Sequence, residues 1–448
     1  MDYPIIQSNI IISSTACTAI DLSTGRCYKI QGNDIKVLSL IDGVRSTYDI
    51  FEILSKENNV DYDNLVEYIK VWCERGFMKL SPIPTEIEYN DKEPIRIVNI
   101  ELTDKCNLKC RYCYGGFHPG NKLSLTSGQI KALFSSLQKR GVRTVELSGG
   151  EPSLHQEFDE IVGIACRMFK NVTIMTNAVH FSDSTYKVFR QNRKNLGFSI
   201  SIDGFSEKTN AFQRGTRNTF EKTLDNILKI KQEINPDYLR VVYMLTNENK
   251  HEIDAFFSQL LDYGIDNLLI SIPEHIAKGR TYSLPDGCDM SNRNSASRKE
   301  LSEVCEEMAA KYYDRVKTIK DSLGEQGYKL ANALPSCGAG WTMLSIKSDG
   351  RVLPCNMMDE RYVLGNCLTD PELNFLSRSN RLYDLLSKIN LSSENDNRKV
   401  CLSCADVNKC NKCVNMILIA NQIRVQNGDN LCPILLKNGF TVNDFASV

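Results

Sequence analysis

Apolar runs of strand length alternate with helical stretches over residues 95–280. In chain order the runs read IRIVNIEL, TVELSGG, NVTIMTN, GFSISIDG, LRVVYMLTN and NLLISIP. Six strands with helices between them predict a parallel α/β sheet or a partial barrel. Because such folds carry their chemistry at the carboxyl ends of the strands, the residues that follow each run are candidates for the site.

The regions on either side have different patterns. Residues 1–85 show short β-rich runs, IIISST and RCYKIQG, and then helical patterns, DIKVLSLIDG and YDNLVEYIKVWCERGFM. A segment with three prolines and four acids, LSPIPTEIEYNDKEP, is typical of a linker. Residues 281–335 form a bridging region with a polar stretch and a helical pattern. Residues 336–448 are rich in cysteine, and we expect irregular structure from 337 to 432.

The composition of the 448 residues is that of an ordinary globular protein, with 42% hydrophobic and 24% charged residues. The net charge of −1 gives no bulk electrostatic reason to expect binding to nucleic acid or to an anionic membrane. The amino-terminal residues lack the features of a signal peptide, and no apolar run is long enough to span a bilayer. We therefore expect a cytoplasmic protein.

Cysteine is the exception, with 17 residues. Because the cytoplasm keeps thiols reduced, metal ligation is a better interpretation than disulfides for the ten cysteines that fall into spaced sets. The other seven are scattered, and we expect them to be small buried hydrophobic residues: Cys17, Cys27, Cys73, Cys166, Cys288, Cys305 and Cys367.

Three cysteines lie together in CNLKCRYC, directly after the first strand: Cys106, Cys110 and Cys113. A structural zinc site usually closes with four ligands. A [4Fe–4S] cluster has four irons, so three cysteines leave one iron open for another ligand. The place at the end of a strand favours the cluster. The alternative is a zinc knuckle that takes its fourth ligand from elsewhere.

This cysteine loop resembles the signature of the radical S-adenosylmethionine (SAM) enzymes. The resemblance implies a partial (β/α)6 TIM barrel in which the open iron is chelated by the amino and carboxylate groups of SAM. It also implies that reductive cleavage of SAM yields a 5′-deoxyadenosyl radical, which abstracts hydrogen from an unactivated C–H bond. Tyr112, before the third cysteine, matches the aromatic residue that contacts adenine in this family.

Further matches follow later strands. LSGGEP, after the second strand, resembles the motif that binds the SAM amino group, which carries that role to Gly149, Gly150 and Glu151. In SISIDG, Ser201 resembles the residue that contacts the SAM ribose or carboxylate, with Asp203 nearby. Two further candidates have alternatives. Arg214 is either a partner of the SAM carboxylate or a surface loop residue, and Asn177 is either polar lining or a turn residue.

The carboxyl-terminal third resembles the SPASM extension of radical SAM peptide maturases, which holds two auxiliary [4Fe–4S] clusters. The resemblance assigns the outer cluster to Cys401, Cys404, Cys410 and Cys432, and the inner one to Cys337, Cys355 and Cys413. Cys410 and Cys413 are separated by two residues where the family has three. YKLANALP, before Cys337, lacks the eighth cysteine of some members, so the inner cluster has either an open iron or a ligand other than cysteine. The alternative is a pair of zinc ribbons, which seven cysteines suit poorly.

Residues 1–85 resemble, in pattern and placement, the winged-helix-like element that binds the leader of a ribosomally made precursor peptide. The leader would add a strand to the edge GRCYKIQG, against the helix at 62–76. The alternative is a domain that only stabilises the barrel.

Together these features are similar to those of the sactipeptide and ranthipeptide synthases. They imply a maturase that joins a cysteine sulfur of a precursor peptide to a carbon, with an electron donor such as flavodoxin or ferredoxin. Carbon–carbon crosslinking is the nearest alternative, and a non-catalytic iron–sulfur protein is the alternative from another class. The sequence identifies no general base.

Overall fold

The computed structural model describes five long stretches of the chain. They are residues 2–84, 95–272, 296–312, 338–391 and 413–445, with gaps at 8–9, 14–17, 22–25, 31, 42, 57–59, 359 and 378, together with Arg315 and Val400. Within these stretches, no helix combines the length and the apolar character that crossing a bilayer requires.

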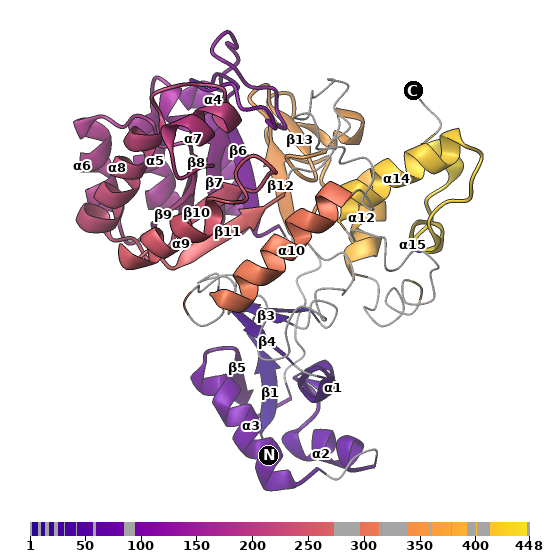
Figure 1. Cartoon of the computed structure of the whole chain (residues 1–448). Helices are drawn as coiled ribbons and strands as arrows, with labels where there is room; N and C mark the ends of the chain where they lie inside the picture. Colours follow the sequence, from indigo (N-terminus) through magenta and orange to yellow (C-terminus); the bar gives the residue numbers. More distant parts are fainter. Residues whose placement is uncertain are drawn as a thin grey trace.

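A nine-stranded sheet forms the body of the protein, in the order β11-β10-β9-β8-β7-β6-β12-β13-β14 (Figure 1). Six neighbouring strands pair in parallel and correspond to the six apolar runs: β6 (Ile97–Thr103), β7 (Thr144–Gly149), β8 (Asn171–Thr176), β9 (Leu196–Ser201), β10 (Leu239–Met244) and β11 (Asn267–Ser271). The predicted parallel α/β sheet is therefore confirmed.

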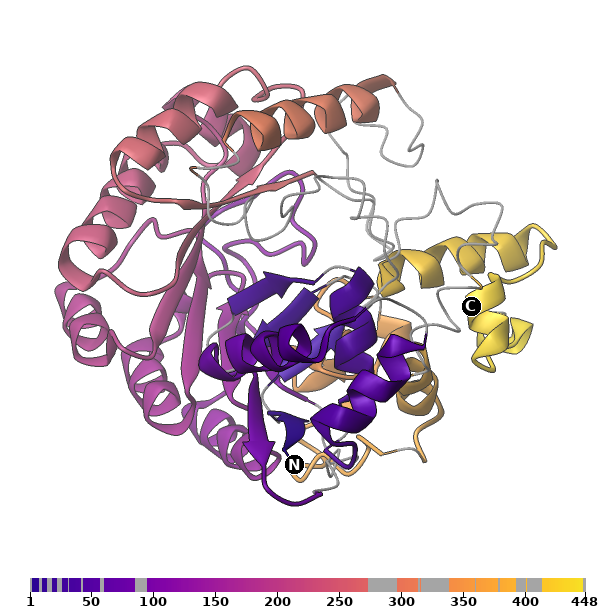
Figure 2. The same cartoon turned by 90° about the horizontal axis from the view of Figure 1, so that it is seen from below.

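Helices connect these strands and follow one curved side of the sheet (Figure 2). They are α4 (Ser127–Lys139), η1 (Pro152–Leu154), α5 (Phe158–Met168), α6 (Asp183–Asn192), α7 (Glu207–Arg214), α8 (Phe220–Lys229), η2 (Ile230–Ile234) and α9 (Ile253–Asp262). Several begin at a hydroxyl side chain that accepts a backbone N–H of the first turn, as Thr126 does for α4 and Ser182 for α6. The main hydrophobic core lies between sheet and helices, where Phe189 packs edge-on against Phe198.

The other face of the sheet is polar. Alternate residues of a strand point to opposite faces, so Val98 and Ile100 enter the core while Asn99 lies on the other side. There Ser148 donates a hydrogen bond to Asn99 Oδ1 (2.8 Å), and the Asn99 amide lies 3.3 Å from Glu146 Oε2. Burial raises the pKa of Glu146. This polar face gives the sheet an interior suited to a hydrophilic ligand.

The cysteine-rich region extends the same sheet. β12 (Met343–Ile346) pairs in parallel with β6, followed by the antiparallel strands β13 (Arg351–Leu353) and β14 (Gly365–Asn366). The helical elements of this region are η4 (Glu360–Tyr362), α12 (Arg381–Leu391), α14 (Val414–Gln426), α15 (Pro433–Lys437) and η5 (Val442–Asp444). The expectation of irregular structure from 337 to 432 is therefore wrong for the elements between Met343 and Gln426. Such short strands carry little pattern, and pairing with β6 supplies the structure that the local sequence does not indicate.

The amino-terminal region has its own core, formed by residues such as Ile50, Leu65, Ile69 and Trp72. It contains a two-stranded pair, β1 (Tyr3–Ile6) with β5 (Met78–Ser81), and a three-stranded antiparallel sheet, β2 (Ile10–Ser13), β3 (Thr18–Asp21) and β4 (Arg26–Lys29). Its helices are α1 (Gly32–Leu40), α2 (Thr47–Ser55) and α3 (Tyr62–Glu74). The run GRCYKIQG contains β4, which lies at the edge of its sheet. The winged-helix assignment and the domain boundaries remain predictions.

The bridging region contributes one described helix, α10 (Ala296–Lys311), held to α9 by an exposed ion pair between Lys311 and Asp254.

Two scattered cysteines, Cys166 and Cys367, are buried in the main core, and burial raises their pKa values to about 12 and about 11. Cys73 and Cys305 pack half-buried against hydrophobic cores. Cys17, Cys288 and the side chain of Cys27 lie outside the described residues.

A buried ion pair joins the cysteine-rich region to β6. Lys347, just after β12, contacts the Glu101 carboxylate, and their side chains are only 11% and 3% exposed. The Lys347 ammonium also donates to the carbonyl of Asn356 (3.1 Å). Because both charges are removed from water, the attraction between them must offset the loss of their hydration.

We predict that Lys347→Met lowers the stability of the protein by about 3–5 kcal/mol, because it leaves the Glu101 carboxylate buried without its cation. The unfolding midpoint in urea should fall. Lys311→Met is the matched control, since the Lys311–Asp254 pair is 52% and 51% exposed. Water screens such a pair, so its loss should shift the midpoint much less. A midpoint for Lys347→Met equal to that of the control would contradict the prediction.

Candidate SAM and iron–sulfur site

The three cysteines of CNLKCRYC lie in the loop after β6, in a small apolar cluster with Leu108 and Phe117. Each sulfur has a donor within reach. The Leu108 N–H lies 3.4 Å from Cys106 Sγ, the Phe117 N–H 3.4 Å from Cys113 Sγ, and the Arg214 guanidinium 3.7 Å from Cys110 Sγ. Such donors stabilise thiolates that bind iron.

Burial raises the pKa of Cys106 to about 12 and that of Cys110 to about 11, although Arg214 pulls the latter downward. As free thiols both would stay protonated at neutral pH. Metal binding must therefore supply the free energy of their deprotonation. The donors and the burial fit thiolates that are ligands of a cluster.

The end of α7 holds this loop in place. The N–H groups of Lys109 and Arg111 donate to the carbonyls of Arg214 (3.1 Å) and Gln213 (3.0 Å). Gly215 follows in the left-handed conformation, with φ +64°, and a Cβ there would lie 2.2 Å from the Lys109 carbonyl oxygen. Only glycine allows the two segments to lie this close.

Tyr112, Asp203 and Arg214 contact one another. The Tyr112 hydroxyl donates to Asp203 Oδ2, and Arg214 Nε lies 2.5 Å from the same oxygen. The other carboxylate oxygen accepts from the Met244 N–H at 2.8 Å. Burial raises the pKa of Tyr112. Burial alone would lower the pKa of Arg214, but the negative charge of Asp203 raises it. The structure thus brings together three predicted SAM-binding residues; their contacts with SAM remain predictions.

The GGE motif packs against the start of the cysteine loop. The N–H groups of Gly150 and Glu151 donate to the carbonyls of Thr103 (2.8 Å) and Lys105 (2.9 Å). A Cβ on Gly150 would lie 2.4 Å from the Lys105 oxygen, and Gly149 has φ +142°. The two glycines therefore let the end of β7 approach the cysteine loop.

Glu151 is 1% exposed and joins the end of β7 to that of β8. Its carboxylate accepts hydrogen bonds from the Thr176 hydroxyl (2.7 Å), the Asn177 N–H (2.8 Å) and the Ser153 hydroxyl (2.7 Å). Burial raises its pKa, and these bonds act in the opposite direction.

Asn177 lies against the cysteine loop, with its amide 2.8 Å from Asn107 Oδ1 and 4.0 Å from Cys106 Sγ. It also accepts the Val179 N–H, as a turn residue does. The amide contacts fit a residue that lines the site, and the Val179 hydrogen bond fits a turn residue, so the structure leaves both interpretations of Asn177 open. Ser201 ends β9 and is half-buried.

Sequence reasoning missed Gln213, which is fully buried beside Arg214. Its amide nitrogen contacts the Thr246 hydroxyl after β10. Its oxygen Oε1 has no hydrogen-bond partner in the part of the chain that the structure describes. A buried acceptor left open is costly, so this position suits a ligand donor. The only sequence signal was its place next to Arg214.

Two of the three cysteines predicted for the inner auxiliary cluster lie in adjoining turns. The Asn415 amide donates to the Met357 carbonyl (3.0 Å), which brings the turn after Cys413 against the turn after Cys355. Cys355 and Cys432, the latter predicted for the outer cluster, pack against the same hydrophobic core of the cysteine-rich region. The remaining four lie outside the described residues: Cys337, Cys401, Cys404 and Cys410.

A polar bridge connects the two cysteine regions. Tyr114, next to Cys113, lies with its hydroxyl 3.4 Å from Glu101 Oε1, and Lys347 connects Glu101 to the Asn356 carbonyl next to Cys355. A cavity of about 170 Å³ opens here. Glu101, Tyr114 and Lys347 line it, together with polar and apolar groups of both regions that include Asp349, Arg351, Leu353 and Met358.

Two family models match the chain. The radical SAM superfamily matches residues 100–260, and an iron–sulfur cluster-binding domain, SPASM, matches residues 337–413. The fold and the cysteine loop thus define a radical SAM protein. More narrowly, the chain belongs to the radical SAM proteins with a SPASM domain, whose cofactors are SAM and [4Fe–4S] clusters.

Two relatives come from Bacillus subtilis (strain 168). The antilisterial bacteriocin subtilosin biosynthesis protein AlbA is 25% identical over 270 residues, which cover 60% of this chain and 57% of AlbA. The chain thus matches little more than half of AlbA. The sporulation killing factor maturation protein SkfB is 24% identical over 380 residues, which cover 82% of this chain and 87% of SkfB.

Solved structures share the fold. Streptococcus suis SuiB bound to SAM matches with a TM-score of 0.54 at 15% identity, covering 93% of this chain and 96% of SuiB. The enzyme anSMEcpe with bound AdoMet and a peptide matches with a TM-score of 0.53 at 16% identity, covering 79% and 97%.

We predict that the reconstituted protein holds ~12 iron atoms per chain, in three [4Fe–4S] clusters. Replacing Cys106, Cys110 and Cys113 with Ala should leave ~8 iron atoms and abolish cleavage of SAM to 5′-deoxyadenosine. Iron analysis and product chromatography measure both. About four iron atoms with zinc in the remainder would show that the auxiliary sites are misassigned.

We also predict that Gly150→Ala disrupts the catalytic cluster, because the added methyl would lie against the Lys105 carbonyl. The variant should lose ~4 iron atoms and most SAM cleavage. Gly163→Ala in α5 is the control, since its Cβ would meet nothing closer than the Arg167 side chain at 3.5 Å. Full iron content in Gly150→Ala would mean that the motif need not lie so close to the loop.

Proposed function

We propose that this protein is a radical SAM maturase of a ribosomally synthesised precursor peptide, and that it forms thioether bonds between a cysteine sulfur and a carbon. The observation that carries the proposal is the closeness of two cysteine regions on one sheet. Tyr114, Glu101 and Lys347 connect the turn that ends at Cys113 to the turn that begins at Cys355. A reaction that needs both sites therefore has a place between them.

The similar proteins support a peptide substrate. SkfB is named a maturation protein, AlbA takes part in the biosynthesis of a bacteriocin, and a SuiB structure contains the precursor peptide SuiA. In this chain, the cavity beside Tyr114 and Lys347 is bordered by the loop after β6, by the turn after β12 and by β13. We propose that it receives side chains of the peptide. The leader would bind the amino-terminal region by strand addition at β4.

When bound, SAM and the clusters supply a radical that removes hydrogen from a C–H bond, an iron with affinity for thiolate, and a place for the electron left over. The residues of the chain orient the reacting groups and shield them from water. Asp203 fixes Arg214 beside the cysteine loop and Tyr112 within it, and Glu151 keeps the ends of β7 and β8 together. Such fixed geometry lowers the entropy cost of bringing the reacting groups together.

The balance of the reaction is simple. The peptide loses one hydrogen atom from carbon and one proton from sulfur, and a C–S bond forms. One SAM takes up one electron and is split into methionine and 5′-deoxyadenosine, which keeps the hydrogen atom. Bond formation releases one electron, which returns to the clusters or to the donor.

We predict that a native substrate peptide perturbs the spectrum of the auxiliary clusters and loses two hydrogen atoms per crosslink. A Cys→Ser peptide should perturb the spectrum less and form no crosslink, while SAM cleavage persists, because hydrogen abstraction does not need the sulfur. Mass spectrometry and absorption spectroscopy provide the readouts. If the Cys→Ser peptide is crosslinked as well as the native one, the product is a carbon–carbon bond instead.

A further inference from the structure

A cationic surface covers the cysteine loop and the adjacent end of α7. Its charged members are Lys105, Lys109, Arg111, Lys208 and Arg217, and we call it the basic face. Four of these side chains are exposed, and Arg111 is half-buried. None of the five forms an ion pair with another described residue. The chain as a whole has a net charge of −1, so this local excess of positive charge is a feature of the face alone.

Contacts between the cysteine loop and the end of α7 position four of the five members of the basic face. The Arg111 guanidinium lies 4.1 Å from the centre of the Phe212 ring, which is 44% exposed. Lys208 stands four residues before Phe212 on α7, on the same side of the helix. Lys109 contacts Gly215, and Arg217 follows two residues later. The face therefore combines an exposed aromatic ring with surrounding cations.

Nearby acids do not neutralise the basic face. The Asp203 carboxylate is buried against Arg214. The Glu207 carboxylate accepts backbone N–H groups at the start of α8, including those of Thr219 (3.1 Å) and Phe220 (2.9 Å). Asp104 is half-buried and accepts the Leu123 N–H at 2.8 Å. Two further carboxylates lie near the face: Glu221 is exposed four residues after Arg217, and Glu248 is half-buried with Oε2 3.5 Å from the Gln213 amide nitrogen. The five cations outnumber them.

The position of this face points to its use. Lys109 and Arg111 flank Cys110, and Lys105 precedes Cys106, so the basic face is the outer cover of the cysteine loop. Cys110 is itself only half-buried. A partner seated here comes as close to the cluster as any macromolecule can from this side. In the reaction proposed above, the first cleavage of SAM needs one electron from outside. A later turnover needs another whenever the electron released on bond formation returns to the donor and not to the clusters.

We propose that the basic face docks a small acidic electron-carrier protein, which loses one electron while the cluster of the cysteine loop gains it. No bond is formed or broken in this step. Opposite charges raise the rate of encounter, and weak electron-transfer complexes bury small interfaces, for which one aromatic ring and five cations suffice. The inference rests on the proposed radical SAM activity, but not on the identity of the peptide product.

The test compares two reductants on the full-length, reconstituted enzyme. The variant Lys208→Glu/Arg217→Glu reverses two exposed charges that lie outside the cysteine loop. With reduced flavodoxin as donor, we expect its rate of 5′-deoxyadenosine formation to fall at least about tenfold. With dithionite, which is too small to need a docking face, the rate should stay within about twofold of the parent. Rising salt should slow the parent with flavodoxin.

The matched control is Lys187→Glu/Lys194→Glu, which reverses two exposed charges on α6 and just after it. It should behave as the parent with both reductants. Equal losses with flavodoxin and dithionite, or a loss no greater than that of the control, would overturn the inference. So would impaired peptide crosslinking with dithionite, because the face would then bind the peptide. An enzyme that cleaves SAM with flavodoxin but modifies no peptide would refute the maturase and leave the docking face standing.

Discussion

The buried ion pair between Asp203 and Arg214 is the interaction on which the rest of the site depends. It joins four parts of the chain: the segment just after β9, the end of β10, the end of α7 and the cysteine loop. Removing two charges from water is costly, and the cost is offset only when further hydrogen bonds satisfy both groups. Tyr112, the Met244 N–H and Cys110 provide them, so the ion pair and the loop stabilise each other.

Sequence reasoning found the parts of this arrangement but not their contacts. The strands β6–β11 were predictable because each is a distinct apolar run between helical stretches. Tyr112, Asp203 and Arg214 were each predicted to contact SAM, yet they also bond to one another, and their separation along the chain hides this. Gln213 belongs to no motif that would mark it. Strands β12–β14 were missed because their pairing partner, β6, lies far away in sequence.

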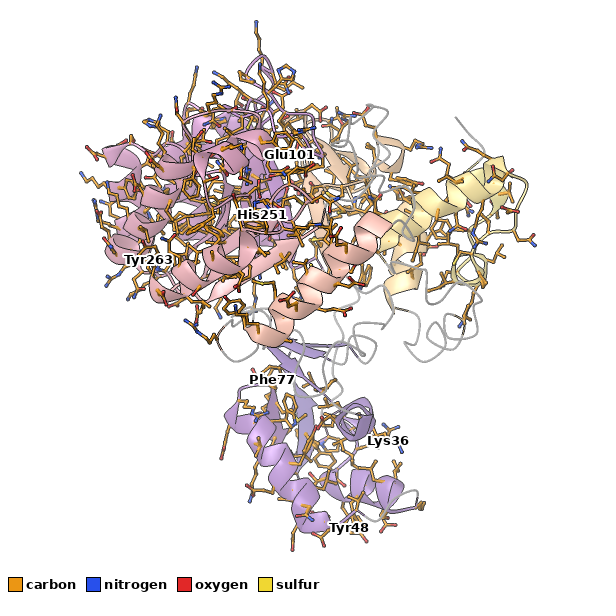
Figure 3. All side chains as sticks on the ribbon, viewed as in Figure 1. Lys36, Tyr48, Phe77, Glu101, His251 and Tyr263 are labelled. Carbon is orange, nitrogen blue, oxygen red and sulfur yellow. The ribbon has the colours of Figure 1, made fainter. Side chains whose placement is uncertain are left out.

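Under the proposed function, leader binding and crosslinking take place in different parts of the molecule. Glu101 lies in the main body of the protein, whereas Tyr48 lies at the far end of the amino-terminal region, with Phe77 between them (Figure 3). A leader bound at β4 would leave the rest of the peptide to extend along the sheet before it meets the cysteines. Under the proposed function, the spacing between leader and modified residue is then part of substrate recognition, in addition to the side chains that enter the cavity.

The pairing of β12 with β6 also bears on how such proteins diversify. β6 carries the cysteine loop at its end, and among the described strands it is β12 of the SPASM region that pairs with one of its edges. Without that region, a central parallel strand would become an open edge with unpaired backbone groups, which invites aggregation. The auxiliary domain is therefore not a module that evolution could add to or delete from a finished barrel in one step. Gene fusions or truncations at this junction would have to rebuild the edge of β6 before they could be tolerated.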